Sequence, residues 1–132
     1  VRVNTSGTII TSADINAKHI KGNSGTLSIA ASTGAGTSPS SISVAGTDMS
    51  GVVTLTTGTS PSINAILATI TYNTAFSTAP VVVITPANAA TASLVAAQAV
   101  WVNIGTANFT INTNATAVNA STIYKWNYVV IQ

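Results

Sequence analysis

Carboxylates, the usual general acids and bases of hydrolases, are scarce in this chain. Asp14 and Asp48 are the two acids among 132 residues, and they stand in stretches of different composition. A hydrolytic pair needs two carboxylates roughly 5 to 10 Å apart in one cleft, and nothing in the sequence brings these two together. Asp48 is expected to close a turn by accepting hydrogen bonds from the backbone of residues 49–51. We therefore predict no catalytic residue and a protein that is not an enzyme.

The remaining ionisable groups do not form a reaction centre or a metal site either. His19 is the sole histidine, and its neighbours Lys18 and Lys21 would lower its basicity. Metal sites require clustered His, Cys, Asp or Glu, and the chain contains no cysteine. Glycine-rich phosphate-binding motifs are also absent from the sequence. We predict no metal and no cofactor.

Aromatic residues are concentrated in the last third of the chain. Tyr124, Trp126 and Tyr128 stand at positions i, i+2 and i+4, so a strand would place them on one face. Such a face is expected to lie in the core or in a subunit interface, because each ring brings about 150 to 250 Å² of buriable area. The alternative is an exposed aromatic platform for a sugar ring.

Trp101 is the better candidate for such exposure. Three aliphatic residues occupy the opposite face of its strand, namely Val100, Val102 and Ile104. Asparagine side chains in the same region could hydrogen-bond sugar hydroxyls. The predicted receptor-binding residues are Trp101, Asn103, Asn112, Asn114 and Asn119.

Period-2 alternation of Val, Ile and Thr predicts strands through most of the chain. The clearest segments are residues 52–57, 66–72, 109–112 and 125–131, and shorter strands are expected at Thr8–Thr11, Thr26–Ala30 and Ser41–Val44. The unbroken apolar run Val81–Ile84 indicates a strand covered on both faces. Ala89–Ala99 is predicted to be a loop with one short helical turn. The pattern predicts an all-β, antiparallel β-sandwich of jelly-roll-like type.

The composition constrains the partners of this chain. Only 5% of residues are charged, against roughly 25% in ordinary soluble domains. The four cations are scattered, so a nucleic-acid partner is not expected. No stretch approaches the ~18 apolar residues of a membrane helix, so we predict no membrane insertion. A surface without charges can be buried against copies of itself at little cost, and it also suits neutral sugars.

Three blocks of the sequence resemble a known family. They are GTLSIAASTGAGTSPSSISVAGTDMSGVVTLTTGTSP at 25–61, ATITYNTAFSTAPVVVITPANAAT at 68–91, and TIYKWNYVVIQ at 122–132. Together they cover just over half of the chain and resemble the C-terminal, receptor-binding tip of bacteriophage tail fibres and related tail proteins. The resemblance implies an intertwined homotrimer at the distal end of a virion tail fibre, which attaches outside the cell to a host surface molecule, often a polysaccharide. No receptor-contact residue carries over, because the binding loops of such tips vary; here we expect variability at Ala89–Ala99 and Asn112–Ser121.

These observations lead to one prediction of function and several alternatives. Residues 1–44 are interpreted as a neck or arm leading from a fibre shaft, and residues 45–132 as the sandwich tip. The tip is predicted to be a non-enzymatic trimeric adhesin for a host glycan or protein receptor. The alternatives are a structural domain that trimerises, caps or decorates a virion, and a bacterial carbohydrate-binding adhesin module. A glycan depolymerase is disfavoured by the shortage of acids.

Overall fold

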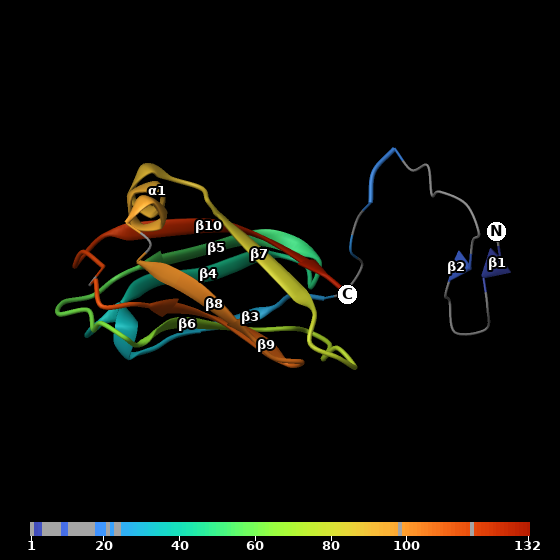
Figure 1. Cartoon of the computed structure of the whole chain (residues 1–132), viewed down its shortest axis with the longest axis horizontal. Helices are drawn as coiled ribbons and strands as arrows, with labels where there is room; N and C mark the ends of the chain where they lie inside the picture. The colour runs from blue at the N-terminus through green and yellow to red at the C-terminus, as the bar shows by residue number, and fades with distance from the viewer. Residues whose placement is uncertain are drawn as a thin grey trace.

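The computed structural model describes residues 2–3, 9–10, 18–20, 22, 25–97, 99–116 and 118–132, with residues 2–3 and 9–10 described by their backbone alone. Two antiparallel four-stranded sheets make up a β-sandwich (Figure 1), with strand orders β4-β5-β10-β7 and β3-β6-β9-β8. A separate antiparallel pair is formed by β1 and β2. The elements are β1 (Arg2–Val3), β2 (Ile9–Ile10), β3 (Ser28–Ala31), η1 (Thr33–Ala35), β4 (Ser40–Gly46), β5 (Ser50–Thr56), β6 (Ile66–Thr71), β7 (Val81–Pro86), α1 (Ala89–Ala96), β8 (Val100–Ile104), β9 (Asn108–Thr113) and β10 (Ile123–Ile131). The predicted all-β antiparallel sandwich is confirmed, whereas the homotrimer stays a prediction.

The chain passes repeatedly between the two sheets. Within them, the pairs β4–β5 and β8–β9 join consecutive strands, and every other connection from β3 to β10 crosses to the opposite sheet. Both sheets therefore contain strands from the early and late parts of the chain. The sandwich begins with β3 at Ser28, so the division predicted at residue 44 does not coincide with its start.

The core lies between the sheets and is built from period-2 strands. Strand β10 alternates strictly: Tyr124, Trp126, Tyr128 and Val130 are buried, and the residues between them are exposed. This confirms that the three aromatic residues belong to the core. Contacts between aromatic rings continue across the sandwich, where the centroids of Phe109 and Tyr128 lie 5.8 Å apart and the ring planes are tilted by 47°.

Strand β7 differs from the prediction that both of its faces are covered. Val82 is buried, but Val81 and Val83 are 63% and 51% exposed. The reason is that β7 is an edge strand in the sheet and has its outer face uncovered in the single chain. A continuous apolar run therefore does not mark a doubly covered strand here.

The segment predicted as a loop with one helical turn is an eight-residue helix, α1. Asn88 caps its N-terminus, because the side-chain Oδ1 accepts from the Thr91 amide at 3.0 Å and from the Thr91 hydroxyl at 2.7 Å. The Thr91 hydroxyl in turn accepts from the Lys125 amide at 2.8 Å. Leu94 and Thr91 are buried, so α1 is held against β10 by packing and by this relay. No helix in the described ranges is long and apolar enough to cross a membrane.

Candidate functional site

The outer face of the sheet β3-β6-β9-β8 carries a row of three cross-strand neighbours. Trp101 of β8 pairs with Asn112 of β9, and Asn112 pairs with Ile66 of β6. Residues directly opposite each other in a sheet point to the same face. Trp101 is 53% exposed, whereas Asn112 is almost fully buried between its two neighbours. The predicted exposure of Trp101 is therefore confirmed.

Two further rows cover the same face with small polar side chains. The first runs Asn103, Thr110, Thr69 and Ala30, and the second runs Asn108, Thr71 and Ser28. None of the residues in these four strands is charged. The face therefore offers hydroxyls, amides and one indole ring on a rigid sheet, and it places no ionic group against a ligand.

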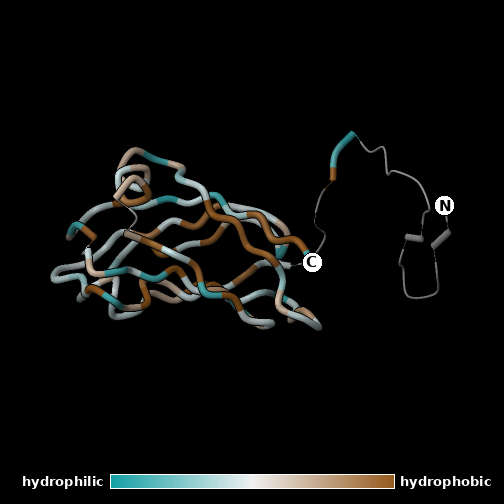
Figure 2. The backbone as a smooth tube through the Cα atoms, in the orientation of Figure 1, coloured by the Kyte–Doolittle hydropathy of each residue, from teal (hydrophilic) through white to brown (hydrophobic). Residues whose placement is uncertain are grey.

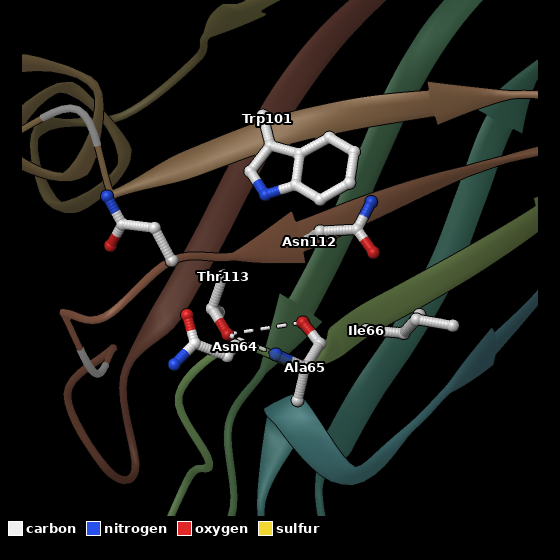
Figure 3. Close-up of a pocket in the computed structure, with 7 residues that line it drawn as sticks. Asn64, Ala65, Ile66, Trp101, Asn112 and Thr113 are labelled. Carbon is white, nitrogen blue, oxygen red and sulfur yellow. Dashed lines mark hydrogen bonds between the residues drawn. The ribbon is translucent and has the colours of Figure 1, made fainter.

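A hollow of about 240 Å³ opens at the end of the face that carries Trp101 (Figure 3). Its volume is below the roughly 300–1,000 Å³ of pockets that bury drug-sized ligands, so it suits a single small unit. The lining combines apolar and amide side chains. The residues are Asn64, Ala65, Ile66, Trp101, Asn112, Thr113 and Asn114.

Hydrogen bonds from Thr113 fix one wall of the hollow. Its hydroxyl contacts the carbonyls of Ser62 at 3.0 Å and Ala65 at 3.1 Å, and the Ala65 amide lies 3.1 Å from the same oxygen. The Asn64 amide donates to the Asn114 carbonyl at 2.9 Å. Asn64 itself has a φ of 50°, a left-handed conformation that asparagine tolerates better than most residues. The wall is therefore formed before any ligand arrives.

The side chain of Asn112 is oriented by its own strand. Its Nδ2 donates to the Thr110 hydroxyl at 2.9 Å and to the Thr110 carbonyl at 3.2 Å. Because the amino group is held in this way, the Oδ1 atom is the part that keeps acceptor capacity. The floor of the hollow thus offers an acceptor between the indole ring and Ile66.

The five predicted receptor-binding residues do not lie together. Trp101, Asn112 and Asn114 line the hollow, and Asn103 lies in the adjacent row of the same face. Asn119 is placed elsewhere: its amide donates to the Tyr124 hydroxyl at 2.9 Å, and its carbonyl accepts from the Thr57 hydroxyl at 2.6 Å.

Sequence reasoning missed four lining residues, namely Asn64, Ala65, Ile66 and Thr113. Ile66 belongs to a predicted strand, but an irregularity in the register between Ile66 and Ala68 decides which way it points. An irregularity of this kind cannot be predicted from the alternation of apolar and polar residues. Asn64 follows Pro61 in a short turn, so the sequence indicates that Asn64 lies in a loop but not that its side chain borders the hollow.

Asp48 lies in a different place and has a structural role. Its two carboxylate oxygens accept from the backbone amides of Asn73 at 2.7 Å and Thr74 at 3.0 Å. These partners are 25 and 26 residues away in the sequence, so Asp48 connects the β4–β5 turn to the segment after β6. The prediction had included only local hydrogen bonds to the backbone of residues 49–51. Asp48 as a whole residue is 4% exposed, and Asp14 lies outside the described residues.

Two tyrosines lie near this carboxylate. Burial, and secondly the negative charge of Asp48, raises the pKa of Tyr72 to about 12 and that of Tyr128 to about 12. The Tyr128 hydroxyl donates to the Thr47 carbonyl at 2.7 Å. His19 is exposed. Among the described residues, no three His, Cys, Asp or Glu side chains gather into a group that could hold a metal ion.

Comparison of the chain with protein-family models, curated proteins and solved structures found no match.

Proposed function

We propose that this chain is a non-enzymatic adhesin that binds a neutral glycan on a cell surface through the outer face of the sheet β3-β6-β9-β8. The observation that carries the proposal is the exposed Trp101 beside uncharged polar rows on a rigid sheet. Aromatic rings present an apolar surface to the C–H face of a sugar ring, and amides and hydroxyls pair with its hydroxyl groups. A neutral glycan has no charge that would need a partner on this face.

In this proposal the setting is the tip of a bacteriophage tail fibre, as the three resembling sequence blocks suggest. The receptor would be a polysaccharide of the host surface, and the adhesin would be a homotrimer. Shallow sites bind single sugars weakly, and three copies on one particle raise the overall affinity by multivalency. An attachment function needs no catalytic group, which fits an Asp48 carboxylate that bonds backbone amides.

The opposite sheet offers a surface for that assembly. Strands β7 and β10 expose four large aliphatic side chains that pair across the strands, Val81 with Ile131 and Val83 with Val129. Figure 2 shows apolar stretches along β7 and at the C-terminal end of β10. This band favours self-association, and it also supports the second candidate, a purely structural trimerising or decorating domain.

Adsorption to cells separates the two candidates. The purified chain, a Trp101→Ala variant and a Thr85→Ala control on the opposite sheet would be incubated with a panel of bacterial cells, and bound protein would be measured. We expect the chain and the control to bind one host and to compete with phage adsorption, and Trp101→Ala to lose binding. A chain that assembles but binds no cell would support the structural candidate, and a Trp101→Ala variant that binds normally would exclude this face.

A further inference from the structure

The hollow beside Trp101 has three recognition elements that together match one chemical group. We infer that it is a subsite for the acetamido group of an N-acetylhexosamine unit; this rests on the proposed glycan-binding function and names the sugar class. An acetamido group has an N–H donor, a carbonyl acceptor and a methyl group. Each of these needs a different partner.

The partner for the N–H group is the Oδ1 atom of Asn112. Its amino group is already bonded to Thr110 at 2.9 and 3.2 Å, so the side chain cannot turn its donor toward a ligand without breaking both contacts. Asn112 is buried at the floor. A ligand without a hydrogen-bond donor would cover the Oδ1 atom of Asn112 and leave it without a hydrogen bond, which is costly for a buried acceptor. The site therefore favours ligands that present a donor to this atom.

The partner for the acetamido carbonyl is the side-chain amide of Asn64 at the rim. Asn64 is exposed, and its one hydrogen bond within the described ranges is made by its backbone, to the Asn114 carbonyl. The side chain is therefore available as a donor. The left-handed backbone of Asn64 and the bonds of Thr113 to the same loop hold it at the edge of the hollow.

The partner for the methyl group is the apolar pair that flanks Asn112. Trp101 and Ile66 lie on opposite sides of it in one cross-strand row, two strand spacings or about 10 Å apart in the backbone. Both side chains are partly exposed. A hydroxyl group in place of the acetamido group could satisfy Asn112, but it would leave these apolar surfaces without an apolar partner. The acetamido group is the substituent that uses all three elements.

Simple glycosides test this inference directly. Methyl glycosides of N-acetylglucosamine and N-acetylgalactosamine would be titrated by NMR against the matched glycosides of glucose and galactose. We expect one acetamido sugar to bind at least about tenfold more tightly than its parent, with shifts at residues that line the hollow. Ile66→Thr should remove most of that preference, whereas Thr85→Ala, on β7 of the opposite sheet, should keep it; circular dichroism would check that both variants fold.

Two results would overturn the inference. One is a parent glycoside that binds as tightly as its acetamido counterpart, and the other is the absence of binding by either acetamido sugar. Neither result decides the proposed function, because cell adsorption that depends on Trp101 would still establish glycan attachment through this face. Loss of both adsorption and sugar binding would reject the two proposals together.

Discussion

Asp48 shows how a single buried charge can connect distant parts of a sandwich. Its carboxylate accepts backbone hydrogen bonds from Asn73 and Thr74, which follow β6, while the residue itself lies in the β4–β5 turn. Hydrogen bonds to charged groups contribute more than neutral ones, and a buried donor left without a partner is costly. In a chain with so few ions, this carboxylate has a stabilising role.

We predict that Asp48→Asn destabilises the fold by about 1–3 kcal/mol. An asparagine keeps one acceptor but turns an amino group toward a backbone N–H. Urea unfolding measures the change, and Asn73→Ala is the matched control, because it retains the backbone amide and removes an exposed side-chain contact of 3.3 Å. Equal stability of wild type and Asp48→Asn would contradict the role assigned to the carboxylate.

Alkaline pH is predicted to destabilise the protein through Tyr72 and Tyr128. Burial raises both pKa values to about 12 in the folded chain, from 10.0. Below pH 10 both states are protonated and stability is unaffected; between pH 10 and 12 the unfolded chain releases protons that the folded chain keeps, so stability falls as pH rises. Urea midpoints measured across this window should decline, and less steeply in Tyr72→Phe. A midpoint that stays constant to pH 12 would be inconsistent with these shifts.

At the scale of elements, α1 depends on its N-cap residue, Asn88, which directly precedes the helix. Asn88 accepts two hydrogen bonds from Thr91, and its Nδ2 donates to the Ile123 carbonyl at 2.9 Å. The side chain thus caps the helix and joins it to β10. Asparagine is one of the residues preferred at a helix N-cap, and the alanine-rich sequence that follows Asn88 favours a helix.

Removal of this cap should cost about 0.5–2 kcal/mol of stability. Asn88→Ala removes the acceptor and the bond to β10 together. Ser93→Ala serves as the control within the same helix, because its hydroxyl is exposed and bonds only the preceding turn at 3.2 Å. If Asn88→Ala unfolds at a temperature no lower than that of Ser93→Ala, the cap does not contribute to the stability of the chain.

The strands were more predictable from sequence than the site. The strict alternation of residues 123–131 predicts that Trp126 is buried, and the aliphatic residues on either side of Trp101 predict that Trp101 is exposed. Both predictions succeed because successive side chains of a strand point to opposite faces, so burial of one face produces a period of two. The hollow depends instead on long-range register: Ile66 faces Asn112 only because β6 is irregular between Ile66 and Ala68. Likewise, the partners of Asp48 are set by how two loops meet. Local patterns carry no information about such contacts.

At the scale of the whole molecule, the two outer faces differ in chemistry. The β3-β6-β9-β8 face is polar, uncharged and marked by Trp101, whereas β7 and the end of β10 expose aliphatic residues. Exposed apolar patches typically mark interaction surfaces. In our proposal the first face binds the glycan and the second contacts other copies of the chain.

A charge on the aliphatic band should prevent self-association without unfolding the chain. Val83→Lys puts a cation next to Val129 at a position that is already exposed. Sedimentation velocity should find a trimer for wild type and for Thr85→Lys, which faces Asn127 outside the band, and a folded monomer for Val83→Lys. A wild-type chain that remains monomeric, or a Val83→Lys variant that assembles normally, would refute this assignment.

We propose that a neutral glycan binds the outer face of the sheet β3-β6-β9-β8. The most direct measurement is amide chemical-shift mapping of the isotopically labelled chain with the surface polysaccharide of a host that it binds, at low and high salt. We expect shifts along β8 and β9, centred on Trp101 and Asn112, and an affinity that salt changes little, because the strands of this face carry no charged residue to screen. Shifts confined to β7 and β10, or binding that salt abolishes, would contradict it.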